Sequence, residues 1–510
     1  MAIEGEKKEE KPAGGYAAAK ALPAQEEVAS MGSGTKRIRS KYTVNPGYTP
    51  VADCFCVRFS PDDQYLAASF ANGAIHVYSA ETGRQEFVLN STPATTELSA
   101  TPLPTTQLRW RPHGAASKTQ SVLISVNAEF DGQILQWHIK SGKCLHTITE
   151  KGNQLFCLDY FNDGSQFATA GRDRLVRVYD EATKRQVMTL QGGDMKVGFL
   201  PGPNILRPLP TTQLRWRPHG AASKTQSVLI SVNAEFDGQI LQWHIKSGKC
   251  LHTITEKGNQ LFCLDYFNDG SQFATAGRDR LVRVYDEATK RQVMTLQGGD
   301  MKETAGHSNR VFSLKYHPED PNLILSGGWD NTVQLWDTRK GISVRSLWNC
   351  YICGDSVDIS TDGKQILTGS WRTENALQLW DFGTGKCMQN VDWESASSKN
   401  PCMIFAAQFS KDTNSNMILA GGSQENEAKF FLRQPAAQPV PFGALVAMPA
   451  LRSPQDLPIS SPQVLLREGG CSVLSKHDNA PEAAQCFRST GDVALGALPV
   501  FYGTSNALHA

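Results

Sequence analysis

The chain has 510 residues, of which 40% are hydrophobic and 20% are charged, and its 51 Lys and Arg residues nearly balance its 50 Asp and Glu residues. A net charge of +1 argues against a whole-chain electrostatic surface for nucleic acid or for an anionic membrane. No apolar run approaches the roughly 20 residues of a membrane-spanning helix. The length on its own suggests three or four domains of about 150 residues each.

The N-terminal segment, residues 1–40, is rich in Ala, Gly, Lys and Glu without hydrophobic periodicity, and we expect it to be disordered. It lacks the apolar stretch of a secretory signal, so we expect a cytoplasmic or nuclear protein with reduced cysteines. Residues 36–41 (KRIRSK) form a basic run. Such a run can serve nuclear import or contact an acidic partner, but we interpret it as a solvated segment that leads into the first strand.

A degenerate repeat then follows over residues 41–433. Each unit opens with an alternating apolar segment that ends at an aromatic or aliphatic residue before a turn, a pattern typical of a β-strand. Eight such segments recur at intervals of 43 to 56 residues. Their last residues are Phe59, Trp110, Tyr160, Trp216, Tyr266, Tyr316, Ile359 and Phe409.

The units continue with a short apolar strand, a tight turn and a third strand that ends near an aromatic residue. Glycine-bearing turns, such as those at Gly142 and Gly385, lead into a further strand. Each unit is therefore predicted to be a four-stranded antiparallel meander. One such sheet cannot bury both faces alone, whereas sheets stacked around an axis cover one another and leave only short edges. The aromatic residues of the third strands are Tyr78, Trp137, Tyr179, Trp243, Tyr285, Trp336, Trp380 and Phe431.

A long duplication lies within this repeat, because residues 208–302 are identical to residues 102–196 over 95 positions. Repeats that diverge under packing constraints do not keep exposed residues such as Lys118 and Lys224 in perfect match. The duplication is therefore either very recent or an artefact of sequence assembly. Eight units are countable with both copies, and six remain when one copy is removed.

The sixth unit carries the most complete motif: Gly306 and His307, then residues 326–330 (SGGWD), then Trp336 and Asp337. The repeat length, the four strands and the terminal Trp-Asp resemble the WD40-repeat β-propeller family over about residues 42–433. The resemblance implies an all-β propeller of eight four-stranded antiparallel blades over residues 41–433, with a seven-bladed or distorted ring as the alternative. We expect residues 434–510, rich in Pro and Ala, to be an irregular C-terminal tail.

The resemblance also implies a buried polar network in the sixth unit. In it, His307 would bridge Ser326 and Asp330, and Ser326 would reach the indole of Trp336. A buried indole N–H needs an acceptor, and a buried carboxylate needs donors. The same residues could form a catalytic His/Asp/Ser triad, but the matching positions change type in other units, as at Thr169. We therefore interpret the four residues as structural.

The tetrapeptide Trp336, Asp337, Thr338 and Arg339 resembles the motif with which some propellers dock onto cullin-RING ubiquitin ligases. In that motif the Arg is exposed and contacts the adaptor protein. The plainer interpretation is that Arg339 is an ordinary solvated turn residue. Arg372, in the longer turn of residues 371–375, joins Asp337 and Arg339 as a candidate for partner binding.

The last unit shows only three strands, and residues 41–44 (KYTV) are placed to supply the fourth by pairing with residues 429–432. The sequence offers no phosphate-binding glycine loop, no HExxH motif and no polar set expected to converge on a channel, and its Cys pairs are weak zinc signals. We predict a non-enzymatic scaffold without cofactor or metal. It would bind other proteins, but no nucleic acid or membrane, as a monomeric propeller within a complex. The alternative is a substrate receptor of a cullin-RING ligase.

Overall fold

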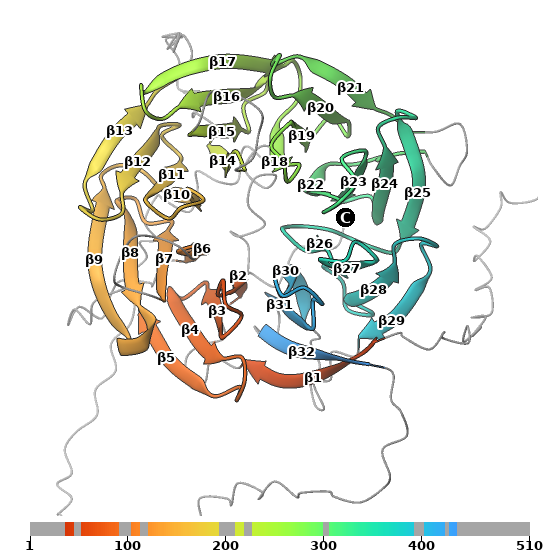
Figure 1. Ribbon diagram of the computed structural model, residues 1–510, viewed down its shortest axis with the longest axis horizontal. Coiled ribbons are helices and arrows are strands. Elements are labelled where there is room, and N and C mark those ends of the chain that lie inside the picture. Colours follow the sequence, from red (N-terminus) through yellow and green to blue (C-terminus); the bar gives the residue numbers. More distant parts are fainter. Residues whose placement is uncertain are drawn as a thin grey trace, which may run out of the picture.

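The chain forms a ring of eight four-stranded antiparallel sheets, viewed down its shortest axis in Figure 1. We number these sheets blades 1 to 8 in chain order. The predictions of an all-β fold and of eight blades are confirmed, and the ring is not the seven-bladed alternative. The computed structural model describes residues 36–44, 53–90, 104–112, 121–192, 210–218, 227–298, 305–391, 402–423 and 428–435.

In blades 1 to 4 the four strands follow one another in the chain, and the first strand lies nearest the axis (Figure 1). A short 3-10 helix, η1 (Ile139–Ser141), follows β8. The strands are, for blade 1, β2 (Cys54–Phe59), β3 (Tyr65–Phe70), β4 (Ala74–Ser79) and β5 (Gln85–Asn90); for blade 2, β6 (Thr105–Trp110), β7 (Val122–Asn127), β8 (Gly132–His138) and β9 (Lys143–Glu150); for blade 3, β10 (Leu155–Tyr160), β11 (Gln166–Gly171), β12 (Val176–Asp180) and β13 (Gln186–Leu190); and for blade 4, β14 (Thr211–Trp216), β15 (Val228–Asn233), β16 (Gly238–His244) and β17 (Lys249–Glu256).

Blades 5 to 7 repeat this order, and blade 8 takes its outermost strand from the N-terminal part of the chain. In the described ranges, no helix has the length and apolar character needed to cross a membrane. The strands are, for blade 5, β18 (Leu261–Tyr266), β19 (Gln272–Gly277), β20 (Val282–Asp286) and β21 (Gln292–Leu296); for blade 6, β22 (Val311–Tyr316), β23 (Leu323–Gly328), β24 (Thr332–Asp337) and β25 (Ile342–Trp348); for blade 7, β26 (Val357–Ile359), β27 (Gln365–Gly369), β28 (Leu377–Asp381) and β29 (Cys387–Val391); and for blade 8, β30 (Met403–Phe409), β31 (Met417–Ser423), β32 (Ala428–Pro435) and β1 (Lys36–Val44).

The ring closes where β1 pairs antiparallel with β32. Val44 lies opposite Ala428 and Tyr42 opposite Phe430, and the register shifts between Ser40 and Tyr42. The predicted pairing of residues 41–44 with residues 429–432 is confirmed. The strand begins earlier than predicted, at Lys36, so the basic run of residues 36–41 lies inside β1 rather than ahead of it.

The core consists of apolar clusters between neighbouring blades. The residues predicted to end the eight first strands all do so, and all are buried: Phe59, Trp110, Tyr160, Trp216, Tyr266, Tyr316, Ile359 and Phe409. Because each blade buries its faces against the next, the eight units form one ring. The three or four domains suggested by the chain length are therefore not what the described residues form.

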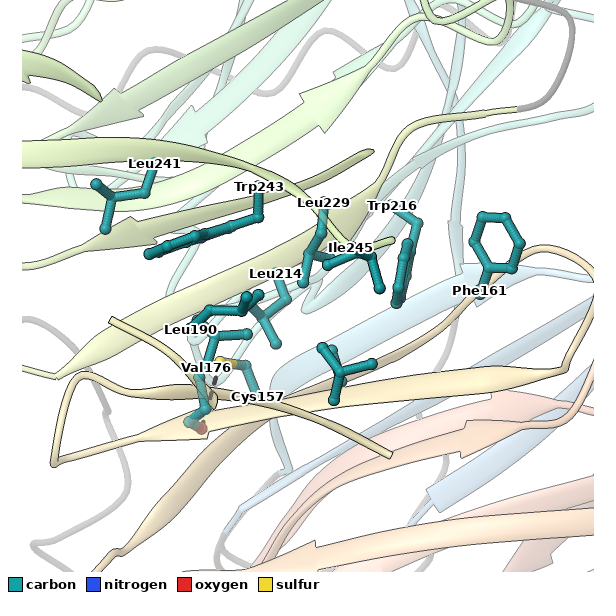
Figure 2. Close-up of a cluster of buried hydrophobic side chains, with 13 residues drawn as sticks. Cys157, Phe161, Val176, Leu190, Leu214, Trp216, Leu229, Leu241, Trp243 and Ile245 are labelled. Atoms are coloured by element: carbon teal, nitrogen blue, oxygen red, sulfur yellow. Dashed lines mark hydrogen bonds between the residues drawn. The ribbon is translucent and has the colours of Figure 1, made fainter. Parts of the chain in front are cut away.

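The duplicated segments form blades 2–3 and blades 4–5 with the same strand registers. Blade 3 contacts blade 4 at a junction that a single copy would not contain. Figure 2 shows this junction, where Cys157 and Val176 of blade 3 meet Leu214, Trp216 and other apolar side chains of blade 4. The junction is filled by apolar side chains, so both copies fit into the ring.

Antiparallel strands give the ring two distinct faces. The upper face, as we define it, carries the turns between second and third strands and the loops that lead into each first strand. The lower face carries the turns between first and second strands and between third and fourth strands. Residues 91–103 and 392–401, in two long loops between blades, lie outside the described residues.

Candidate functional site

A polar network in blade 6 joins the four residues that the sequence motif singles out. Trp336 Nε1, on β24, donates to Ser326 Oγ, on β23, at 2.6 Å. His307, in the loop before β22, places Nε2 2.7 Å from the same hydroxyl and Nδ1 2.8 Å from Asp330 Oδ2. Since a carboxylate only accepts, Nδ1–H donates to Asp330 and neutral Nε2 accepts from Ser326. The donors and acceptors thus form an unbroken series from the indole to the carboxylate.

The environment of this network explains its charge state. Burial on its own raises the pKa of Asp330, but the hydrogen bonds from His307 and from the Ser308 amide outweigh burial and leave the pKa below its ordinary value. The Ser326 side chain is fully buried between His307 and Trp336. A hydroxyl in this position is closed to a substrate, so the geometry favours a stabilising role over a catalytic triad.

Replacing Asp330 with Ala is expected to cost about 1–3 kcal/mol of unfolding free energy, because it leaves buried donors unpaired. The depressed pKa means that this contribution is present above pH 4 and is lost as the pH falls through the folded-state pKa, below the usual carboxyl range of about 4. Thermal melts at pH 7 and at pH 3 would measure both effects. An unchanged melt of the variant at pH 7 would contradict the stabilising role.

Blades 3 and 5 contain a network that the sequence analysis missed. Glu150, at the end of β9 in blade 2, accepts hydrogen bonds from Thr169 Oγ1 and from Tyr179 OH of blade 3, the latter at 2.9 Å. Arg177 Nη1 lies 2.7 Å from its other carboxylate oxygen. Glu256, at the end of β17 in blade 4, makes the same contacts with blade 5. A carboxylate thus replaces the imidazole of blade 6, and a phenol replaces the indole.

Charged side chains converge on the central channel, contrary to the prediction that no polar set does so. Each is the next-to-last residue of the first strand of its blade. From blade 2 to blade 7, positively and negatively charged side chains alternate at this position. The field at Asp355, in the loop before β26, comes from cations of four different blades. In chain order, the next-to-last residues of the eight first strands are Arg58, Arg109, Asp159, Arg215, Asp265, Lys315, Asp358 and Gln408.

Many of these channel charges form ion pairs between blades. Arg109 Nε lies 3.2 Å from Asp159 Oδ1. Asp355 is 3.0 Å from Arg58 Nη2 and 3.4 Å from Lys315 Nζ. Burial on its own raises the pKa of Asp355, but Lys315 and Arg58 hold it well below its usual range. Within the described ranges, no group of three His, Cys, Asp or Glu side chains is placed to hold a metal ion.

The candidate partner-binding residues do not form one site. Arg339, in the turn after β24 on the lower face, has a 60% exposed side chain. Its Nε and Nη2 each lie 2.9 Å from a different oxygen of Asp337, and this hydrogen bonding lowers the pKa of the Asp337 carboxyl. Arg372 lies on the upper face, where its Nη1 donates to the Asn349 carbonyl at 2.5 Å. The two arginines therefore belong to opposite faces of the ring.

Comparisons with known proteins identify repeats in four stretches of the chain. The family model described as "WD domain, G-beta repeat" matches residues 44–79, 142–180, 248–286 and 298–337. Among curated proteins, the chain is similar to "Cell division cycle 20.1, cofactor of APC complex" of Arabidopsis thaliana, with 24% identity over 259 residues, which are 49% of this chain and 50% of that protein. It is also similar to "Coronin-like protein crn1" of Schizosaccharomyces pombe, with 28% identity over 146 residues, or 29% of this chain and 23% of that protein.

The chain thus spans half or less of the length of these two relatives. Among solved structures, the computationally designed Ika8 protein matches with a TM-score of 0.53 and 16% identity, over 76% of this chain and 98% of that one. At this identity the likeness concerns the fold alone. Together, the four repeat matches and the closed ring of eight blades show that the chain belongs to the WD40-repeat β-propeller family.

Proposed function

We propose that the protein is a non-enzymatic scaffold that presents the two faces of its propeller to partner proteins in a multiprotein complex. The observation that carries the proposal is the closed ring of eight blades, with loops gathered on two faces. Loops on a rigid scaffold are the usual place for recognition. A similar protein is named as a cofactor of the APC complex, which supports a role among other proteins.

The channel charges support binding over catalysis. A propeller enzyme would need reactive groups at the axis, and a general base works best when its pKa lies near the working pH. The pKa of Asp355 is instead held far below that range by two nearby cations. Its carboxylate therefore contributes to the contact between blades and is a weak base. The partner proteins would meet a monomeric propeller in the cytoplasm or the nucleus.

The scaffold proposal can be tested by affinity purification of the tagged full chain, followed by cross-linking and mass spectrometry. We expect stable partners in defined ratio, with cross-links to loop residues of the upper or lower face. Recovery of the chain alone, at monomer mass, under gentle conditions would contradict the proposal.

A second candidate is a substrate receptor of a cullin-RING ligase. The observation in its favour is that the exposed guanidinium of Arg339 is oriented by Asp337 and available on the lower face. The test is recovery of the ligase adaptor with the wild type and with Arg339→Ala. Loss of the adaptor in the variant supports this candidate, and equal recovery, or none from either chain, removes it.

A further inference from the structure

Six aromatic rings form a continuous arc on the upper face of blades 5 to 8. Some stand near the beginning of a first strand, and the others lie in the turn after a second strand or in a loop before a first strand. Both locations belong to the upper face because the first two strands of a blade are antiparallel. The members of this aromatic arc are Phe262, Phe312, Trp329, Tyr351, Trp371 and Phe405.

The rings of the aromatic arc contact one another in series. Phe262 stacks on Phe312 with ring centroids 5.0 Å apart, and Phe312 lies 4.8 Å from Trp329. Trp329 and Tyr351 are 6.3 Å apart and nearly parallel, with an interplanar angle of 8°. Trp371 continues the series at 6.3 Å from Tyr351. It lies 6.0 Å from the last ring, that of Phe405, so four blades contribute to one surface.

Stacking decides which part of each ring a partner can meet. The five successive pairs have interplanar angles between 8° and 34°, and three of them are stacked: Phe262 with Phe312, Trp329 with Tyr351, and Trp371 with Phe405. Five of the six residues are only half-buried, and the sixth is Phe405, which is buried. Where rings stack in series, the edge of each ring is the part left for a partner. The edge of an aromatic ring is the positive end of its quadrupole and favours a negative group.

Guanidinium groups stand beside the arc. Arg278 follows β19, next to the strand that carries Phe262, and its Nη1 donates to the Gln260 side-chain oxygen at 3.4 Å. Arg372 directly follows Trp371 and donates to main-chain carbonyls. Both arginines thus hydrogen-bond to neutral oxygens, and each keeps a positive charge that a carboxylate could pair with.

We propose that the aromatic arc and its arginines form the docking surface for an acidic segment of a partner protein, with carboxylates on Arg278 and Arg372. This inference rests on the scaffold function and names one surface and one class of partner for it. A cationic partner is disfavoured because cation–π binding needs a free ring face, and Arg310 already lies over Trp329, 5.6 Å from its centroid. Single-stranded nucleic acid is disfavoured for the same reason, since its bases stack on ring faces.

The duplication provides a matched control. Arg172 of blade 3 occupies the position of Arg278 and donates to Gln154, as Arg278 donates to Gln260. The difference lies in the next blade. Phe262 contacts the ring of Phe312 in blade 6. For its duplicate Phe156, the equivalent residue in the next blade is Thr212, whose hydroxyl donates to main-chain carbonyls. Arg172 therefore has the same local contact but stands outside the aromatic arc.

The experiment measures fluorescence anisotropy of a labelled ten-residue peptide of Asp and Glu around one Phe and one Leu. The matched probes are the same peptide with Gln in place of every acid, and a labelled ten-residue oligothymidylate. We expect the acidic peptide to bind the full chain. Arg278→Gln and Arg372→Gln should each weaken binding roughly tenfold, the effect of one lost charge-assisted hydrogen bond. Arg172→Gln should leave binding within about twofold, because it is remote from the arc.

A substitution at Glu374 is expected to strengthen binding of the acidic peptide. It is exposed and lies two residues from Arg372, so its carboxylate repels an acidic ligand. Glu374→Gln should therefore tighten binding of the acidic peptide and leave the Gln peptide unaffected. All four variants are surface changes, and equal thermal melts would show that any effect on binding does not come from unfolding.

The outcomes separate this inference from the scaffold function. Failure of the full chain to bind the acidic peptide, an equal loss with Arg172→Gln, or preference for the oligothymidylate would each overturn the docking surface. The scaffold function would survive any of these results if partners still purify with both the wild type and the Arg278→Gln chain. Absence of partners from the wild type would instead count against the scaffold function itself.

Discussion

Removal of residues 1–44 is expected to lower the melting temperature by about 10 °C or more, since a loss of several kcal/mol produces a shift of this size. The truncation removes β1, the described strand from the N-terminal part of the chain that is hydrogen-bonded into blade 8. Blade 8 would then keep three strands, and β32 would expose an unpaired edge. Differential scanning fluorimetry measures the shift, and size-exclusion chromatography reports association through the new edge.

A shorter truncation provides the control. Removal of residues 1–35 leaves β1 intact and should keep the melting temperature within about 2 °C, since the sequence of this segment predicts disorder. The contrast between the two chains isolates the strand. If removal of residues 1–44 left the melt unchanged, β1 would contribute nothing to closure, and the remaining contacts between blades 8 and 1 would close the ring. One such contact is that between Phe59 and Phe430, whose ring centroids are 6.2 Å apart.

The fold could be predicted from the sequence because each unit repeats the same local pattern. Even the three-residue strand β26 was located, since Ile359 stands before a turn at the expected spacing. The pairing of β1 with β32 followed from counting strands, because the last unit lacked a fourth. The number of blades depended on whether all countable units join one ring. That is a property of the contacts between blades, which the pattern of a single unit does not contain.

The less predictable features all depend on how neighbouring blades meet. Glu150 ends the last strand of blade 2 but accepts hydrogen bonds from Thr169 and Tyr179 of blade 3, so its role is hidden when each unit is analysed alone. The charged residues of the channel could have been predicted from the sequence, because they occupy one fixed position before the end of each first strand. The aromatic arc could not be predicted from any single unit, since its rings, such as Phe262 and Phe312, come from adjacent blades.

Replacing Trp216 with Ala should cost about 3–5 kcal/mol of unfolding free energy, the usual effect of deleting a buried Trp side chain. Trp216 is 4% exposed and lies at the junction of blades 3 and 4, with its ring 4.8 Å from that of Phe161 (Figure 2). Its Nε1 donates to the Asp159 carbonyl at 3.3 Å. Urea unfolding measures the loss as a lower midpoint with an unchanged slope.

The first copy supplies the comparison for this variant. Trp110 holds the same position in blade 2, is 7% exposed, and donates to the Arg58 carbonyl of blade 1 at the same distance of 3.3 Å. The two tryptophans thus belong to blades of identical sequence that pack against different neighbouring blades. Trp110→Ala and Trp216→Ala should therefore destabilise the chain to a similar extent if both junctions form.

A Trp216→Ala chain as stable as the wild type, beside a destabilised Trp110→Ala chain, would show that blade 4 does not pack on blade 3. The structure gives a physical reason to expect the opposite result. Phe161 of blade 3 contacts Trp216, while its duplicate Phe267 of blade 5 contacts Tyr316 of blade 6, with centroids 5.9 Å apart. The same face of a blade thus accepts either aromatic residue of the next blade. Because one pair of blades also adds one Arg and one Asp to the channel, at Arg215 and Asp265, the insertion preserves the alternation of charge around the axis.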